Sequence, residues 1–107
     1  YKDRGFYVIG VPSNQFGGQE PGTNSEIKDF CETNFNITFP ITDKTNVKGD
    51  DAHEIYKWAK KNHGKSTVPK WNFHKILINK DGKIEDTFNS FITPMSDKIT
   101  KQIDLIL

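Results

Sequence analysis

The chain contains little cysteine: Cys31 is the only one among 107 residues. A single thiol cannot form an internal disulfide, which excludes the small secreted domains that several disulfides hold together. No apolar run approaches the roughly 18 residues that a membrane-spanning helix needs, so we expect no stable membrane insertion. The net charge is only +1, from 15 basic and 14 acidic residues, and gives no sign of a nucleic-acid partner. With these classes excluded, the 107 residues fit one small globular domain.

Several cofactor signatures are also missing. The three histidines, His53, His63 and His74, have no ligand-like spacing, and Cys31 stands alone. The segment DKTNVKGDDAHE is similar to a calcium loop only in composition, because Val47 stands where an oxygen ligand is required. The chain has neither a phosphate-cradling glycine loop nor a serine nucleophile elbow. We therefore expect no metal and no bound cofactor.

The first residues indicate that a helix ends there. Lys2 and Arg4 before Gly5 are typical of the last helical turn, where cations offset the dipole and glycine takes a left-handed conformation. The apolar, β-branched run Phe6–Val11 predicts a strand buried on both faces. We interpret the chain as the C-terminal part of a longer domain. The alternative is a frayed first turn of an entire protein.

The remaining elements follow from periodicity and capping signals. Thr23-x-x-Glu26 is a capping box and predicts a helix over 24–34, and Asp51-x-x-Glu54 begins a second helix that Gly64 ends. The Asp81-Gly82 pair predicts a hairpin with a two-residue primed turn. The predicted segments are an extended stretch at 37–43, a helix at 52–62, a hairpin at 71–89 and an amphipathic helix at 95–107. Hydrophobic residues make up only 34% of the chain, but eight Phe and two Trp supply core material for a mixed α/β sheet with flanking helices.

Four residues have an ordinary and a chemical interpretation. Cys31 lies on the apolar face of its helix beside Phe30, where a lone cysteine is usually a small buried hydrophobe. Trp71 and Asn72 begin the first predicted strand of the hairpin, where a tryptophan usually belongs to the core. Gln19 lies in the loop VPSNQFGGQEPG at residues 11–22, where a glutamine is usually solvated. Taken one at a time, none of them identifies an activity.

Read together, the segments resemble the glutathione peroxidase family of thioredoxin-fold thiol and selenol peroxidases. The resemblance rests on the blocks NQFGGQEPGTNSEI, FCETNFNITFPI, NVKGDDAH and KWNFHKILINKDGKI, in this order and spacing, and it covers essentially all 107 residues. It implies an α/β, thioredoxin-like fold with a mixed central sheet, lacking its N-terminal strand and helix in this chain. It also implies that residues 1–107 form one N-terminally incomplete domain.

The resemblance further implies a catalytic tetrad. A peroxidatic cysteine or selenocysteine would act with a Gln, a Trp and an Asn, which the motifs place at Gln19, Trp71 and Asn72. Neutral N–H donors can stabilise a chalcogenolate without adding a competing nucleophile. The peroxidatic residue would lie upstream, so the chain alone would not perform the first step.

The same resemblance assigns Cys31 as a resolving cysteine, which forms an intramolecular disulfide that thioredoxin reduces. Ser13 stands where many members have a further cysteine. The short segment between Lys60 and Trp71 lacks the insertion of tetrameric members, which implies a monomer that uses thioredoxin or glutathione as its reductant.

The leading interpretation is a peroxidase that reduces hydrogen peroxide and organic or lipid hydroperoxides in the cytoplasm. The alternative is a truncated, non-catalytic pseudo-peroxidase or a redox-sensing binding module. An unrelated α/β binding domain would require all four blocks to match by chance.

Overall fold

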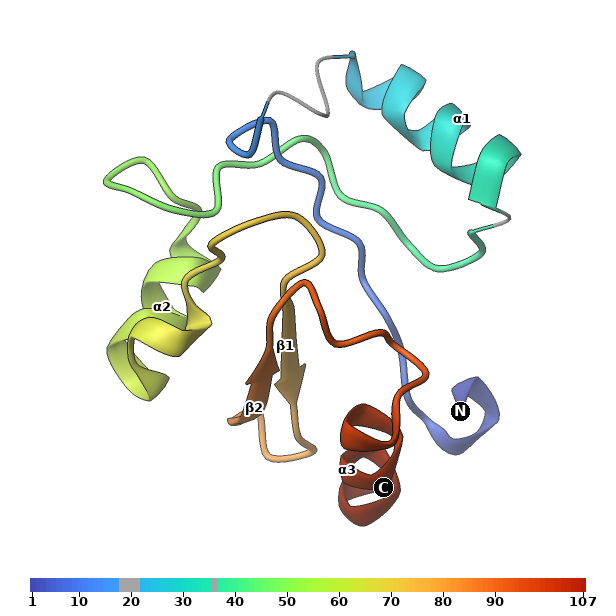
Figure 1. Ribbon diagram of the computed structural model, residues 1–107, viewed down its shortest axis with the longest axis vertical. Helices are drawn as coiled ribbons and strands as arrows, with labels where there is room; N and C mark the ends of the chain where they lie inside the picture. The colour runs from blue at the N-terminus through green and yellow to red at the C-terminus, as the bar shows by residue number, and fades with distance from the viewer. Residues whose placement is uncertain (18–21, 36) are drawn as a thin grey trace. The chain divides into compact units, whose positions relative to one another are not determined.

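A computed structural model describes residues 1–17, 22–35 and 37–107 (Figure 1). Gln19 lies outside the described residues, as do the neighbouring Gly18, Glu20 and Pro21. The chain divides into two compact units, Tyr1–His53 and Glu54–Leu107, each of which is described by itself. No helix in the described part of the chain is long and apolar enough to cross a membrane.

The N-terminal unit begins with a short 3-10 helix, η1, at Lys2–Arg4. Gly5 ends it with φ 86°, and its N–H donates to Lys2 O at 3.0 Å. The left-handed backbone is the conformation that glycine adopts without a steric penalty. The predicted helix end at Gly5 is therefore confirmed.

The predicted strand at Phe6–Val11 is wrong for the described structure. Tyr7 is 68% exposed, Val8 and Ile9 are exposed as well, and only Gly10 pairs, through a parallel bridge to Ile41. Gly10 N donates to Pro40 O and Thr42 N donates to Gly10 O, both at 2.9 Å. An apolar run becomes a buried strand only between partner strands. Among the described residues of this unit, a single bridge provides that pairing.

The helix α1, Asn24–Phe35, confirms the prediction for residues 24–34. Glu26 N donates to Thr23 Oγ1 at 3.2 Å, as a capping box requires. Within the described residues, the Glu26 carboxylate accepts from the Thr23 hydroxyl at 3.1 Å and not from a backbone N–H. One half of the box therefore caps the helix, and the other half orients the capping hydroxyl.

Two stretches of the N-terminal unit run side by side, residues 10–16 and residues 40–48. After the bridge at Gly10, Thr45 N donates to Pro12 O at 2.8 Å. The buried hydrophobic residues of this unit come from these two stretches, from α1 and from the segment that follows residue 48: Phe16, Val47, Ile27 and Ala52. Residues 10–16 are thus tied to the second stretch by backbone hydrogen bonds.

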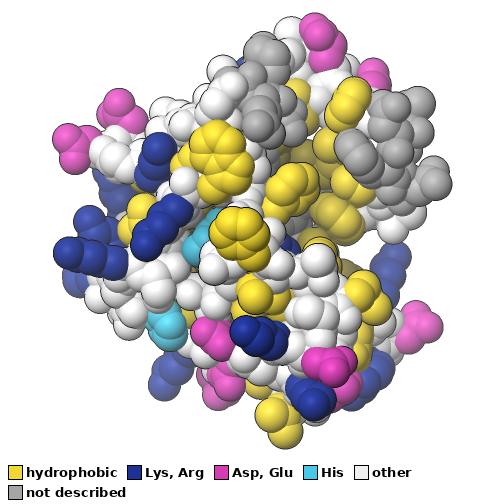
Figure 2. Space-filling view, in the orientation of Figure 1, with side chains coloured by type: hydrophobic (Ala, Val, Ile, Leu, Met, Phe, Trp, Pro, Cys, Tyr) yellow, Lys and Arg dark blue, Asp and Glu magenta, His cyan; other side chains and the backbone are white. Residues whose placement is uncertain are grey.

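The C-terminal unit consists of the helix α2, a β-hairpin and the helix α3, with α2 and α3 on either side of the hairpin in Figure 1. The helix α2, Glu54–His63, begins two residues later than predicted and ends at Gly64, whose N–H donates to Lys60 O at 2.9 Å. Ala59 is buried, whereas Ile55 and Trp58 are exposed. Lysine side chains gather over α2 (Figure 2), whose last turn contains Lys60 and Lys61.

The hairpin pairs β1, Lys75–Ile78, with β2, Ile84–Phe88, in antiparallel register. The predicted two-residue primed turn is wrong, because Gly82 takes φ 76° while Asp81 does not have a positive φ. Asn79 N donates to Lys83 O at 2.8 Å, which closes a three-residue loop with glycine in the left-handed position. Asn79 Oδ1 also accepts from Asp81 N and Lys83 N at 3.0 and 3.1 Å, and this side chain stabilises the longer turn.

The helix α3, Asp97–Ile106, confirms the amphipathic helix predicted near the C-terminus. Ile99 and Ile103 are buried, as their helical spacing indicated. Ile106, one turn further on, is partly exposed. Every helix and strand of this unit contributes a buried side chain, and Pro69 is buried as well; the others are Ala59, Thr67, Leu77, Phe88, Ile99 and Ile103.

Candidate functional site

The side chain of Gln15 fastens the NQF segment to residues 47 and 48. Its Oε1 accepts from Val47 N at 2.7 Å and from Lys48 N at 3.2 Å, while its Nε2 donates to Lys48 O at 3.1 Å. Next to it, Phe16 is buried and the Lys48 ammonium lies 4.6 Å from the centre of its ring. Gln15 therefore joins residues 10–16 to residues 40–48 by three side-chain hydrogen bonds, at a point where the two stretches are not paired as β-strands.

Replacing Gln15 by Ala is expected to lower the free energy of unfolding by about 2–4 kcal/mol, because two N–H groups and one carbonyl lose their partner in a half-buried place. Gln15→Glu is the matched variant. It keeps the acceptor for both N–H groups, loses the donor to Lys48 O, and should be destabilised less. Urea unfolding of the complete protein measures both values. An unchanged urea midpoint for Gln15→Ala would contradict the stabilising role of the three Gln15 hydrogen bonds.

Ser13, two residues before Gln15, is buried, and its Oγ accepts from Gln15 N at 3.3 Å. This contact begins the turn that carries Gln15 and Phe16. Gln19 follows Gln15 by four residues and lies outside the described part of the structure. Its catalytic role therefore remains a prediction.

Cys31 lies in the third turn of α1, one turn after Ile27. Ile27 is only 4% exposed, whereas Cys31 is partly exposed and Phe30 is exposed. The thiol is therefore not a fully buried core group, and the interpretation of Cys31 as a small buried hydrophobe is not favoured. A partly exposed thiol on a short helix can be reached when that helix loosens locally.

Trp71 and Asn72 lie together in a turn at residues 71–73, and one residue, His74, separates this turn from the start of β1 at Lys75. The prediction that they start a strand is therefore wrong. Trp71 is 49% exposed, so its assignment to the core is wrong as well, and Asn72 is partly exposed. The turn places an indole and a carboxamide, both of which carry N–H donors, at the surface of the C-terminal unit.

The residue that follows, Phe73, has a left-handed backbone with φ 63°. It is the one non-glycine residue with positive φ in the described part of the chain. Lys75 Nζ donates to Phe73 O at 2.6 Å, and burial lowers the pKa of Lys75 below its ordinary value. The backbone on the C-terminal side of Asn72 is thus held by a specific contact.

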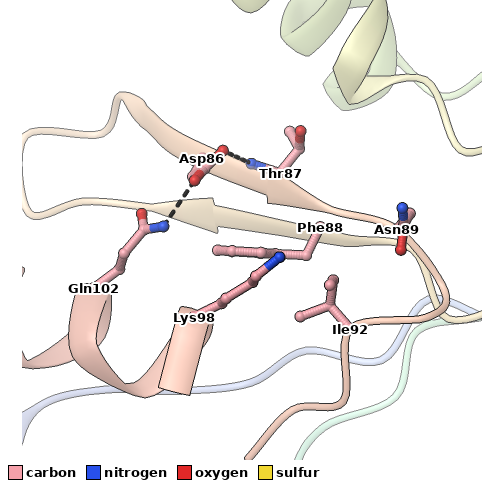
Figure 3. A pocket seen from close by; sticks show the side chains of 7 residues that line it. All are labelled: Asp86, Thr87, Phe88, Asn89, Ile92, Lys98 and Gln102. Atoms are coloured by element: carbon pink, nitrogen blue, oxygen red, sulfur yellow. Dashed lines mark hydrogen bonds between the residues drawn. The ribbon is translucent and has the colours of Figure 1, made fainter. Parts of the chain in front are cut away.

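A cavity of about 310 Å³ lies elsewhere in the same unit, between β2, the segment after it and α3 (Figure 3). Asp86, on its wall, accepts from Gln102 Nε2 and from Thr87 N, both at 2.7 Å. Lys98 and Phe88 also line it. None of the predicted site residues does, and the Asp86 carboxylate is engaged within the protein. We regard this cavity as a packing feature of the β2–α3 contact.

No group of His, Cys, Asp and Glu side chains that could hold a metal ion occurs among the described residues. The chemistry available from the described site residues is thus a partly exposed thiol at Cys31 and neutral N–H donors at Trp71 and Asn72. These belong to different units, so each is placed within its own unit only.

The comparisons with known proteins point to one family. Residues 1–60 match the profile described as "Glutathione peroxidase". The chain is 45% identical over its whole length to the "Glutathione peroxidase-like peroxiredoxin GPX5" of Chlamydomonas reinhardtii, and covers 66% of that protein. It is 40% identical, again over its whole length, to the "Hydroperoxy fatty acid reductase gpx1" of Synechocystis, of which it covers 67%.

A third relative is the "Putative glutathione peroxidase 7, chloroplastic" of Arabidopsis thaliana, 44% identical over the whole chain, which covers 46% of that protein. Among solved structures, the crystal structure of Trgpx in apo form matches with a TM-score of 0.65 at 39% identity. That match covers 92% of this chain and 58% of the other. The chain thus spans about two thirds or less of the length of these proteins.

The structure gives contacts to two residues that the sequence did not single out for a role, each of which is close in the sequence to a predicted site residue. Gln15 lies inside the NQFGGQE block, where only its neighbour Gln19 had been assigned a role. His74 follows the turn of Trp71 and Asn72 and was considered only as a metal ligand. For both, the available signal was adjacency to a motif rather than any property of the residue itself.

Proposed function

Since the chain belongs to the glutathione peroxidase family, we propose that it forms the greater part of a thiol-dependent peroxidase with a thioredoxin-like α/β fold. The substrates are hydrogen peroxide and organic or lipid hydroperoxides. The reductant is a thiol, for which we propose thioredoxin over glutathione. The names of the relatives, which include a peroxiredoxin and a hydroperoxy fatty acid reductase, support this reaction class.

The reaction begins with a thiolate or selenolate that this chain does not supply, because its one cysteine is Cys31. We place that group in a segment upstream of Tyr1, with residues 1–107 as one incomplete domain. The chalcogenolate attacks one oxygen of the peroxide, the O–O bond breaks, and the other oxygen leaves as water or alcohol after taking a proton. The chalcogen is oxidised to a sulfenic or selenenic acid, and the peroxide is reduced.

Gln19, Trp71 and Asn72 stabilise the anion before this attack and the charge that develops on oxygen during it. The observation that carries this assignment is the turn at residues 71–73, which leaves Trp71 half exposed and Asn72 beside it. An indole N–H and a carboxamide donate hydrogen bonds without competing for the peroxide. Gln19 is assigned by its place in the NQFGGQE block alone.

Cys31 completes the cycle as the resolving thiol. Its sulfur attacks the sulfenic sulfur, a disulfide forms, and the sulfenic oxygen leaves as water. A dithiol reductant then exchanges with this disulfide, becomes oxidised itself, and returns both thiols. The partial exposure of Cys31 supports the assignment, because the reductant must reach one of the two sulfurs.

The protein acts as a monomer in the cytoplasm, where reductants keep thiols reduced. The short connection between Lys60 and Trp71, of which Lys65–Thr67 forms the 3-10 helix η2, supports the monomer. The chloroplastic relative shows that other members of the family reside elsewhere. The proposed cycle needs neither a bound metal nor a bound cofactor.

An assay of the complete protein tests the proposal. With thioredoxin, its reductase and NADPH, the protein should consume NADPH on addition of hydrogen peroxide or of a fatty acid hydroperoxide. Replacing thioredoxin by glutathione should give slower turnover. Absence of peroxide reduction with either thiol, by a folded protein, would favour a pseudo-peroxidase or a redox-sensing module instead.

A further inference from the structure

We propose that His74 is a positioning residue, whose neutral ring holds the Trp71–Phe73 turn against η2 and whose protonation releases that turn. The inference rests on the proposed function, because the turn carries two of the residues assigned to stabilise the reacting anion. It adds a residue and a pH dependence that the motifs themselves do not contain.

The turn needs such support because its last residue is strained. Phe73 has φ 63°, a backbone region that costs a bulky L-residue about 1–2 kcal/mol. Its ring is 79% exposed, so packing of that side chain offsets little of the cost. The contacts on either side of Phe73 must therefore hold the conformation, and His74 is the next residue.

The His74 ring lies in a protected place. Its Nε2 is shielded from solvent and has no hydrogen-bond partner within the described structure. Hydrogen bonding with the backbone of Ser66 and Thr67 links the ring to η2. Thr67 is 1% exposed, and both its hydroxyl and its N–H donate to Gly64 O, at 2.8 and 3.2 Å. The ring therefore rests on a fixed support, which a neutral imidazole can contact without bringing charge into it.

The electrostatic surroundings oppose a charged ring. The charged groups that act on it are both cations, Lys75 on β1 and Lys70 on the segment before the turn. Burial first, then repulsion by these lysines, lowers the pKa of His74 below its ordinary value of 6.5, although the backbone of Ser66 and Thr67 favours the charged form. Among the described residues, no carboxylate contributes to this balance.

Because burial lowers the pKa of His74, we expect its contact with η2 to weaken at low pH. The unfolded or released ring binds a proton near pH 6.5, whereas the buried ring binds one only at lower pH. The contact is therefore at full strength above pH 6.5 and weakens as the pH falls from there toward the pKa of the buried ring. Once protonated, the ring is better solvated away from η2, and Phe73 then loses the support of His74 and keeps the Lys75 hydrogen bond to its carbonyl.

Fluorine NMR of the complete protein labelled with 5-fluorotryptophan tests this inference, with Trp71 assigned by the loss of its signal in Trp71→Phe. The Trp71 resonance should shift between pH 8 and pH 5 with a midpoint below 6.5. His74→Phe should abolish that shift, and so should His74→Gln, which serves if the Phe variant does not fold. His63→Asn, which removes an exposed histidine of α2 in the same unit, should leave the shift intact.

A Trp71 resonance that does not titrate, or one that titrates equally in His74→Gln, would overturn the inference. Because the measurement needs no turnover, a His74-dependent shift in an inactive protein would uphold it while contradicting the proposed function. In an active protein, kcat/KM should fall by about tenfold for each pH unit below the midpoint, as the neutral fraction falls. In His74→Gln that part of the fall should be missing.

Discussion

The Cys31→Ser variant of the complete protein is expected to lose at least about 100-fold of its thioredoxin-dependent turnover and to keep its first reduction of peroxide. Serine has nearly the same size and preserves the position on α1, but its oxygen cannot form the disulfide that thioredoxin reduces. The oxidised peroxidatic group then accumulates as a sulfenic acid or oxidises further. NADPH consumption measures the turnover, and mass spectrometry after one equivalent of peroxide measures the accumulated acid.

A matched control is available on the same helix. Ser25→Ala changes an exposed residue in the first turn of α1 and should leave both measurements unchanged. If Cys31→Ser turned over with thioredoxin at the original rate, the resolving role would be refuted, and a direct attack of the reductant on the sulfenic acid would replace it. Loss of the first reduction as well would instead indicate damage to the fold.

The second large effect is expected at the Trp71–Asn72 turn, where Trp71→Phe and Asn72→Ala should each lower kcat/KM for peroxide by about 10²–10³-fold. Phenylalanine keeps most of the apolar area and removes the indole N–H, while alanine removes the carboxamide. Both changes take a donor from an anion that must be stabilised before and during the attack. Stopped-flow reduction of hydrogen peroxide isolates this step from the regeneration by thioredoxin.

The chain provides its own control, because its other tryptophan, Trp58, is exposed on α2. Trp58→Phe is the same chemical change outside the motif and should keep the peroxide rate within twofold, a limit of about 0.4 kcal/mol in activation free energy. Equal losses in the two Trp→Phe variants would show that the chain responds to the loss of any indole. Unchanged rates in both motif variants would remove Trp71 and Asn72 from the site.

The helices were the most predictable part of the structure, because local signals decide them. The Thr23 cap and the spacing of Ile27 gave α1 to within one residue at its C-terminal end, and the spacing of Ile99 and Ile103 located α3. Both signals act within one or two turns of the chain. The α/β class followed from the order of such elements.

The errors occurred where the outcome depends on contacts between segments. Phe6–Val11 has the composition of a buried strand, but composition does not supply a partner, and Tyr7 and Ile9 remain exposed. At the hairpin, the Asp81-Gly82 pair was recognised while the side chain that determines the loop length, Asn79, was overlooked. Likewise, the turn that exposes Trp71 depends on a left-handed Phe73, which no propensity predicts.

The candidate site was predicted mainly by resemblance and only slightly by physical pattern. Gln19, Trp71, Asn72 and Cys31 each have an ordinary interpretation when considered alone. For Trp71 and Cys31, the structure adds partial exposure, which disfavours the ordinary interpretation. The supporting contacts of Gln15 and His74 were not predictable, because a side chain that binds a distant backbone leaves no periodicity in the sequence.

The pairing of the hairpin also restricts how its length can change during evolution. Lys75, Ile76 and Leu77 pair with Phe88, Thr87 and Asp86, whereas Ile78 pairs with Ile84, so that Glu85 is an extra residue in the second strand. Loss of the residue at position 85 would bring all four pairs into one register and leave the faces of residues 86–88 unchanged. Loss of residue 86 would give the same regular pairing with Glu85 in the place of Asp86, and loss of residue 87 would move the Asp86 carboxylate to the opposite face. A gap at position 85 therefore disturbs the pairing of β2 least, and it removes the Glu85 carboxylate that accepts from Asn79 Nδ2 at 3.1 Å.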